Sequence, residues 1–130
     1  PLKTFGGTCA GSKPLQELHE SIRLGFDSML NSSDDPSKLM RTRHIVDVMN
    51  KIGKCVVSGN IRRTAEIAFG EHDDQEFINL KNYDMYPDRM NHGWVSNNSI
   101  FAQLGQDYSS VADSIIKNGE PGIAWLDNMR

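Results

Sequence analysis

Helical and strand-like patterns alternate along this chain, and that alternation is the feature that most restricts its fold. Apolar residues recur every three or four positions over Leu15–Asn31 and again over Tyr108–Asn118, which is the period of a helix with one buried face. Strand-like runs occupy Ala65–Phe69 and Gly122–Leu126. Repeated helix-then-strand order predicts an α/β fold with a largely parallel sheet.

Four further segments complete the expected order of elements. A second helical pattern begins near Leu39 and includes Ile52, and Gly53 is expected to end or bend it. Asp73–Leu80 predicts a short helix, and its acidic start suits the helix dipole better than a metal site. Trp94–Ala102 predicts another strand, whose central amides must find hydrogen-bond partners. Gly119 is expected to terminate the last helix.

Composition and charge exclude several classes of protein. The net charge of -3 and the pI near 5.8 argue against a nucleic-acid binder, which would show a basic face. The sequence contains neither an apolar run long enough to span a bilayer nor the series of residues that marks a signal peptide. We therefore expect a cytoplasmic protein.

The two cysteines and four histidines predict no metal site and no disulfide framework. Cys9 and Cys55 are far apart in the sequence, whereas structural zinc sites need more ligands at closer spacing. We interpret both as free thiols. The histidines are scattered, and we expect them to be solvated or locally hydrogen-bonded.

The two ends suggest a longer protein. The chain starts at Pro1 and stops at Arg130, soon after the apolar run Gly122–Leu126. Native domains usually end in exposed polar chain. We therefore expect that both ends were set by cutting a longer polypeptide.

One arginine-rich loop carries the strongest candidate binding residues, which are Ser58, Gly59, Asn60, Arg62 and Arg63. A guanidinium group matches phosphate oxygens with two parallel hydrogen bonds, and an amide can pair with a base edge or a ribose hydroxyl. On these residues alone, a surface turn whose arginines pair with carboxylates is the more frequent arrangement.

A small-residue loop near the start is a second candidate, with Gly6, Gly7, Thr8 and Gly11 ahead of a helix. Backbone donors at a helix N-terminus can meet an anion. The loop lacks the lysine of a P-loop and the spacing of a dinucleotide fingerprint. By itself it is better explained as a structural loop.

Four blocks of sequence, taken together and in order, resemble one enzyme family. They are Pro1–Thr8 (PLKTFGGT), Val56–Gly70 (VVSGNIRRTAEIAFG), Ser96–Ile100 (SNNSI) and Gly119–Ile123 (GEPGI). The chain resembles the adenosylcobalamin-dependent ribonucleoside-triphosphate reductases from end to end. The stretch between the first two blocks is similar to the monomeric, triphosphate-using branch.

The resemblance implies a fold and a role for this segment. It implies that residues 1–130 are an internal fragment of a ten-stranded α/β barrel. Phe5–Gly11 resembles the end of the first allosteric loop, and Ser58–Thr64 resembles the second, which lies between effector and substrate. The residues implied to contact substrate or effector are Gly6, Gly7, Thr8, Ser58, Gly59, Asn60, Arg62 and Arg63.

The resemblance also implies the chemistry of the whole enzyme. It implies reduction of ribonucleoside triphosphates to 2′-deoxyribonucleotides, started by adenosylcobalamin through a cysteine thiyl radical. The implied partners are a triphosphate substrate, a deoxynucleotide effector and a thioredoxin-type reductant, with a monomeric parent. Cys9 and Cys55 match none of the redox cysteines, so we expect no catalytic residue here, a cofactor bound mainly by other parts, and an inactive isolated fragment.

Two other interpretations of the residues stay open. A regulatory nucleotide-binding α/β module could use the same arginine loop without catalysis. A structural α/β domain could use Arg62 and Arg63 only for ion pairs.

Overall fold

The chain forms two compact units, Pro1–Ala65 and Glu66–Arg130. The computed structural model describes residues 8–32, 40–59 and 62–129. In the described part of the chain, no helix is both long and apolar enough to cross a membrane.

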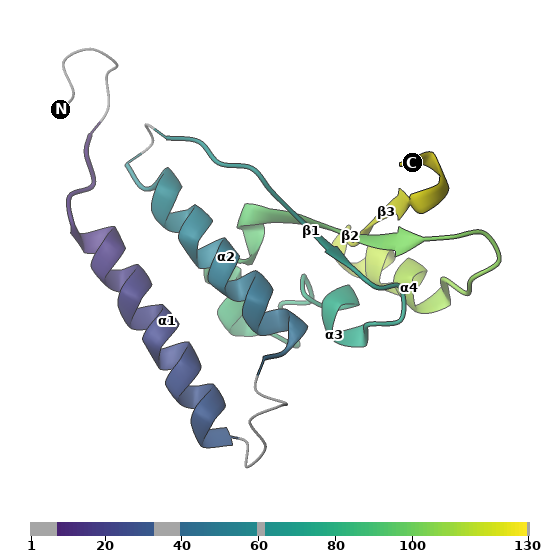
Figure 1. Cartoon of the computed structure of the whole chain (residues 1–130), viewed down its shortest axis with the longest axis horizontal. Coiled ribbons are helices and arrows are strands. Elements are labelled where there is room, and N and C mark those ends of the chain that lie inside the picture. The colour runs from purple at the N-terminus through teal and green to yellow at the C-terminus, as the bar shows by residue number, and fades with distance from the viewer. Residues whose placement is uncertain (1–7, 33–39, 60–61, 130) are drawn as a thin grey trace. The chain divides into compact units, whose positions relative to one another are not determined.

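The first unit is a pair of helices that lie side by side (Figure 1). Helix α1 spans Lys13–Ser32 and helix α2 spans Thr42–Val57, so the helix expected over Leu15–Asn31 is confirmed. The better-buried positions of α1 include Leu18, Ile22, Gly25 and Met29, which share one face at helical spacing. The Lys51 ammonium on α2 donates to the Ser21 carbonyl of α1 at 3.3 Å.

Helix α2 continues past Gly53, so the expectation that this glycine ends the helix is wrong. The alternative, a bend at Gly53, stays a prediction. Gly53 is buried on the same face as Val46 and Asn50, at the i, i+4, i+7 positions of a helix. Tertiary burial offsets the roughly 1 kcal/mol that a glycine costs inside a helix. The end of α2 instead comes at Ser58 and Gly59, where Gly59 has a φ of 86°.

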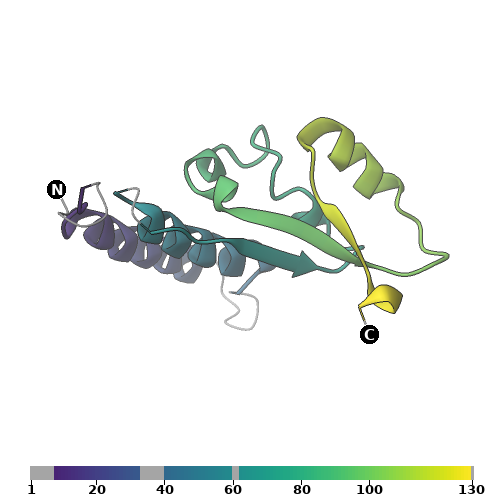
Figure 2. The ribbon, with the colours of Figure 1, turned by 90° about the horizontal axis from the view of Figure 1, so that it is seen from above.

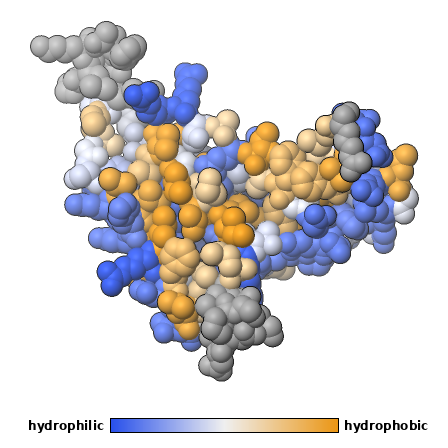
Figure 3. All heavy atoms as spheres, viewed as in Figure 1, coloured by the Kyte–Doolittle hydropathy of each residue, from blue (hydrophilic) through white to orange (hydrophobic). Residues whose placement is uncertain are grey.

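The helix pair also carries exposed apolar side chains, and Figure 3 shows them as a stripe over α1 and α2. On α2 they include Ile45, Met49 and Ile52, and on α1 they include Phe26. An apolar strip of this kind on a helix pair is typical of a surface that another segment covers.

The second unit is built on a three-stranded parallel sheet. Strands β1 (Glu66–Gly70), β2 (Ser96–Ala102) and β3 (Gly122–Trp125) lie in the order β1-β2-β3. Glu66 is aligned with Ser96, and Ser99 is aligned with Gly122. The α/β class and the parallel sheet are thereby confirmed. The sheet of the described residues has three strands, and the ten-stranded barrel that the resemblance implies stays a prediction.

Short helices connect these strands. Helix α3 (Gln75–Ile78) is shorter than the expected helix over Asp73–Leu80, and the Asp74 carboxylate caps it by accepting from the Phe77 N–H at 3.0 Å. Helix α4 spans Ser109–Asn118, and Gly119 ends it with a φ of 76°, as expected. The single-turn 3-10 helices are η2 (Pro87–Asn91), η3 (Gly93–Val95) and η4 (Leu126–Asn128).

The strand expected over Trp94–Ala102 begins two residues later than predicted. Trp94 and Val95 belong to η3, where the Val95 N–H donates to the His92 carbonyl at 3.2 Å. The Trp94 indole N–H donates to the Asn91 carbonyl. Local turn hydrogen bonds therefore override the β propensity of these two residues.

Helices cover one face of the sheet, and Figure 2 shows α4 and η2 on the same side of the strands. Ile100 and Ala102 of β2 are fully buried on this face together with Phe77, Ile78 and Val111. The Ser114 hydroxyl of α4 donates to the Ile78 carbonyl at 2.9 Å. These contacts form the apolar core of the unit.

The amino-terminal half of β2 is held by a polar cluster instead. The Lys81 ammonium donates to the carbonyls of Gly93 (2.7 Å) and Ser96 (2.5 Å), and it lies 3.5 Å from the Glu120 carboxylate. That carboxylate accepts the Asn98 N–H at 3.0 Å. Burial lowers the pKa of Lys81 below its usual value, although Glu120 acts in the opposite direction.

Replacing Lys81 with methionine should destabilise the sheet. The change keeps the apolar stem but leaves the Glu120 carboxylate and two carbonyls without their donor, and the side chains of Lys81 and Glu120 are only 10% and 23% exposed. We expect a loss of about 2 to 3 kcal/mol in the local free energy of opening, since removing one member of a buried ion pair leaves the other charge without its counter-ion. Hydrogen exchange of peptides covering β2 in the intact protein measures this loss. The matched control is Lys117→Met, an exposed lysine of the same unit, which should change exchange little.

Two glycine-to-alanine changes should have opposite signs. A Cβ on Gly70 would lie 2.3 Å from the ring of Phe77, which is buried, so Gly70→Ala should cost about 1 to 3 kcal/mol through overpacking. A Cβ on Gly25 would meet only the Lys51 Nζ at 3.9 Å, so Gly25→Ala should stabilise α1 by up to about 1 kcal/mol. Local hydrogen exchange of β1 and α1 measures both. Equal effects at the two positions would contradict the packing around Gly70.

Candidate functional site

The arginine-bearing loop begins where α2 ends. The Ser58 N–H and the Ser58 hydroxyl both donate to the Cys55 carbonyl, at 3.2 Å and 2.6 Å, which satisfies a carbonyl that the helix leaves free. Gly59 follows in the left-handed region with a φ of 86°, the conformation that glycine adopts readily after a helix. The backbone direction after α2 is therefore set by Ser58 and Gly59.

Gly59 lies against the backbone of the first candidate loop. A Cβ placed on Gly59 would come within 2.6 Å of the Thr8 carbonyl oxygen and 3.2 Å of the Ala10 nitrogen. Such distances leave room only for a hydrogen atom at this position. The structure thus brings Thr8 and Gly59, two of the predicted site residues, into direct contact.

Arg62 and Arg63 follow in exposed chain without regular secondary structure. Within the described residues, the structure gives neither guanidinium group a hydrogen bond or an ion pair. The surface-turn interpretation, which pairs these arginines with carboxylates, stays open. Three residues span at most about 11 Å of chain. The backbone of Arg62 is therefore at most about 11 Å from Gly59, and that of Arg63, four residues along, at most about 14 Å.

Three of the predicted site residues lie outside the described residues, namely Gly6, Gly7 and Asn60. Their roles stay predictions. The described part of the predicted site consists of Thr8, Ser58, Gly59, Arg62 and Arg63.

This arrangement suits the binding of a polyanion. The guanidinium groups of Arg62 and Arg63 follow the Gly59 contact in the chain, and each can offer paired N–H donors to phosphate oxygens. The Ser58 hydroxyl already donates to Cys55, so it shapes the end of α2 and has only lone pairs left for a ligand. Phosphate recognition therefore depends chiefly on the arginines.

The second unit also contains a buried polar cluster that was not predicted from the sequence. Arg89 is fully buried and donates to the Leu80 carbonyl, while Lys81 and Glu120 form the ion pair described above. The side-chain Oδ1 of Asn98 accepts from the Ser96 hydroxyl at 2.8 Å, and the Nδ2 of the same amide has no partner among the described residues. The requirement that the strand amides find partners was the one sequence signal that pointed here, and it is met only in part.

The histidines and cysteines form no candidate metal centre. In residues 8–32, 40–59 and 62–129, no group of three or more His, Cys, Asp or Glu side chains could hold a metal ion. Cys9 is an exposed free thiol and Cys55 is a partly exposed one. His44 accepts from the Arg41 N–H at 3.3 Å, a local hydrogen bond of the expected kind.

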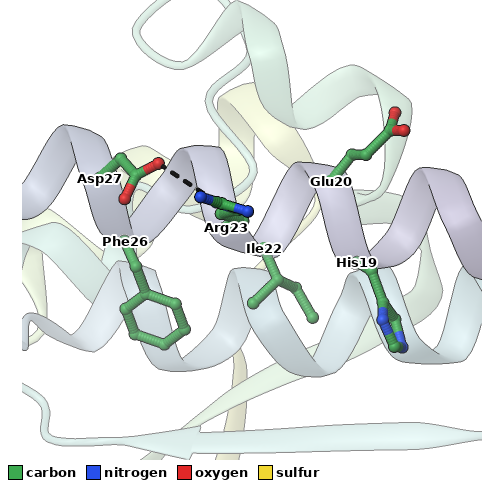
Figure 4. A pocket seen from close by; sticks show the side chains of 6 residues that line it. All are labelled: His19, Glu20, Ile22, Arg23, Phe26 and Asp27. Atoms are coloured by element: carbon green, nitrogen blue, oxygen red, sulfur yellow. Dashed lines mark ion pairs between the residues drawn. The ribbon is translucent and has the colours of Figure 1, made fainter.

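A surface hollow also occurs on α1 (Figure 4), lined by His19, Glu20, Ile22, Arg23, Phe26 and Asp27. All six side chains come from one helix. The Arg23–Asp27 ion pair of 3.9 Å is mostly exposed, and such i,i+4 pairs serve the helix itself. This hollow contains none of the predicted site residues.

Comparison with known proteins identifies relatives along the whole chain. The chain is 57% identical over 130 residues to a probable adenosylcobalamin-dependent ribonucleoside-triphosphate reductase of Dictyostelium discoideum, covering 100% of the chain and 16% of that protein. It is 52% identical over 129 residues to the adenosylcobalamin-dependent ribonucleoside-triphosphate reductase of Euglena gracilis, covering 99% of the chain and 17% of that protein. The Lactobacillus leichmannii enzyme of the same name is 40% identical over 124 residues, with 95% of the chain and 16% of that protein covered.

The match concerns one part of these enzymes, because the chain spans 16 to 17% of the length of the curated relatives it matches. No family model matches the chain, and no solved structure does. The alignments nevertheless cover nearly every residue of the chain, and the relatives agree in the kind of enzyme. The chain is therefore homologous, along its whole length, to one segment of the adenosylcobalamin-dependent ribonucleoside-triphosphate reductases.

Proposed function

We propose that this chain supplies nucleotide-contacting loops to a reductase that converts ribonucleoside triphosphates to 2′-deoxyribonucleotides. The observation that carries the proposal is the pair of exposed guanidinium groups, Arg62 and Arg63, beside the contact between Gly59 and Thr8. The relatives are named as ribonucleoside-triphosphate reductases, and a triphosphate is the part of such a substrate that arginine recognises best. The chain thus contributes to effector and substrate specificity.

The proposed roles differ from residue to residue. Arg62 and Arg63 contact phosphate oxygens, whereas Ser58 and Gly59 set the direction in which the chain leaves α2. Thr8 lies at the same contact and offers its hydroxyl and backbone. Asn60, Gly6 and Gly7 remain predicted contacts to the nucleotide.

We further propose that the parallel sheet is a portion of a ten-stranded α/β barrel. Parallel sheets are normally covered on both faces. Here the helices of the unit cover one face, while Ile67 and Phe69 are 63% and 44% exposed and Phe69 stacks on Phe101 at 5.1 Å. An apolar face of this kind suits the interior of a barrel that further strands complete.

The cofactor is proposed to bind mainly to other parts of the enzyme. The relatives are named for adenosylcobalamin, but the hollow on α1 is lined by a single helix and cannot enclose a corrin ring. Cys9 and Cys55 are free thiols and are given no redox role. A deoxynucleotide effector, a thioredoxin-type reductant, a monomeric state and a cytoplasmic location complete the proposal.

Replacing Arg62 and Arg63 together with alanine in the intact reductase should weaken triphosphate binding. Hydrogen bonds to charged groups contribute about 1.5 to 3 kcal/mol each, so the loss should be roughly tenfold to a hundredfold or more in Kd. Equilibrium dialysis with a nucleoside triphosphate measures it. The double variant should also reduce the dependence of substrate choice on a deoxynucleotide effector, measured as relative rates with the four ribonucleotides.

Two controls separate recognition from general damage. Arg23→Ala removes an exposed arginine of α1 and should leave the Kd unchanged. Replacing both loop arginines with lysine keeps the charge but loses the planar fork, so its effect should be intermediate. Binding of cobalamin, followed by absorbance, should be unaltered in every variant. If triphosphate binds to the double alanine variant as tightly as to the wild type, the proposed function is wrong.

A further inference from the structure

The contact between Gly59 and the 8–10 segment excludes any side chain at position 59. The Thr8 oxygen at 2.6 Å and the Ala10 nitrogen at 3.2 Å from a Cβ placed there are both backbone atoms. Backbone cannot rotate aside as the end of a long side chain does. Even the single methyl group of alanine would therefore push the two segments apart.

Comparison with a second glycine shows which requirement at Gly59 is steric, the absence of a side chain, and which is conformational, the positive φ. Gly11 has a φ of 71°, close to the 86° of Gly59, but a Cβ at Gly11 would meet nothing within 4 Å. Both glycines satisfy a left-handed backbone. Only Gly59 also joins two segments that are far apart in the sequence.

The position of the arginines depends on the contact between Gly59 and the 8–10 segment. On one side, Gly59 is fixed to α2 through the hydrogen bonds from Ser58 to Cys55. On the other side it touches the 8–10 segment. Since the backbone of Arg62 is at most about 11 Å of chain from Gly59, a displacement of Gly59 shifts the point from which the chain leads to the arginine pair.

We infer that Gly59 is a positioning residue. Its close contact with the backbone of Thr8 and Ala10 holds the arginine pair where it can bind a nucleoside triphosphate. The inference rests on the proposed function, because it acts through Arg62 and Arg63. The 8–10 segment thereby becomes one wall of the triphosphate site, and a shift in either segment changes how the phosphates are held. A misplacement of about 1 Å is enough to weaken oriented contacts strongly.

The test compares Gly59→Ala with Gly11→Ala in the intact reductase, with ATP as the probe and its Kd from equilibrium dialysis as the readout. Gly59→Ala should weaken binding about tenfold, and Gly11→Ala less than about threefold, since alanine at Gly11 meets strain but no neighbour. Gly59→Asn should resemble Gly59→Ala, because asparagine tolerates positive φ but still carries a Cβ. Binding restored by asparagine would overturn the inference.

A double-mutant cycle shows whether Gly59 acts through the arginines. In the Arg62→Ala, Arg63→Ala background, Gly59→Ala should add less than about a threefold loss, because residues that act as a unit are not additive. Fully additive losses would overturn the inference and leave the proposed function standing. An unchanged Kd in the double arginine variant would overturn both.

Cys9 gives a measurement on the wild-type enzyme that does not require a glycine variant to fold. Its thiol is exposed and lies between the two residues that Gly59 touches. Saturating ATP should slow alkylation of Cys9 by about threefold or more, since a ligand in the site reduces access to the thiolate. Mass spectrometry of the Cys9 peptide measures the rate, and the slowing should disappear in the double arginine variant. An unchanged rate in the wild type would overturn the inference.

Discussion

The ion pair between Lys81 and Glu120 ties together the segment after α3, the start of β2 and the residues just before β3. Lys81 follows the core residue Leu80, Glu120 precedes β3, and the carbonyls that Lys81 bonds lie at Gly93 and Ser96, just ahead of or within β2. Because a charge removed from water must be fully paired, each of these partners is held in place. Glu120 also accepts the Asn98 N–H one residue before β2 begins to pair with β3.

The covered face of β2 changes character along its length. Ser96 and Asn98, at the amino end, lie with the buried charges, whereas Ile100 and Ala102, at the carboxyl end, pack with the apolar core. This division fixes the register, because a slip of one residue would turn every one of these side chains to the other face. The polar half therefore specifies the alignment of the strands, while the apolar half supplies most of the free energy of burial.

Elements with a strong local period could be predicted from the sequence, and features decided by tertiary contact could not. The α1 and α4 helices and the parallel sheet follow from periodicity and helix-strand order. Gly53 was wrongly predicted to end α2, because its burial within that helix depends on tertiary contacts that the neighbouring residues do not indicate. No periodic pattern in the sequence indicates the cluster of Lys81, Arg89 and Glu120. At the candidate site, the residue types were predictable, whereas the contact of Gly59 with Thr8 joins positions that no spacing rule relates.

The chain uses arginine in two physically different ways, and the difference bears on function. Arg89 is fully buried and donates to the Leu80 carbonyl, so its charge belongs to the fold. Arg62 and Arg63 are exposed, and the described residues provide them with no acceptor. A guanidinium group left in water keeps its full capacity for an incoming anion, since no internal bond must first break. At this loop, Ser58 and Gly59 therefore set the position of the chain, and the arginines attract the anion.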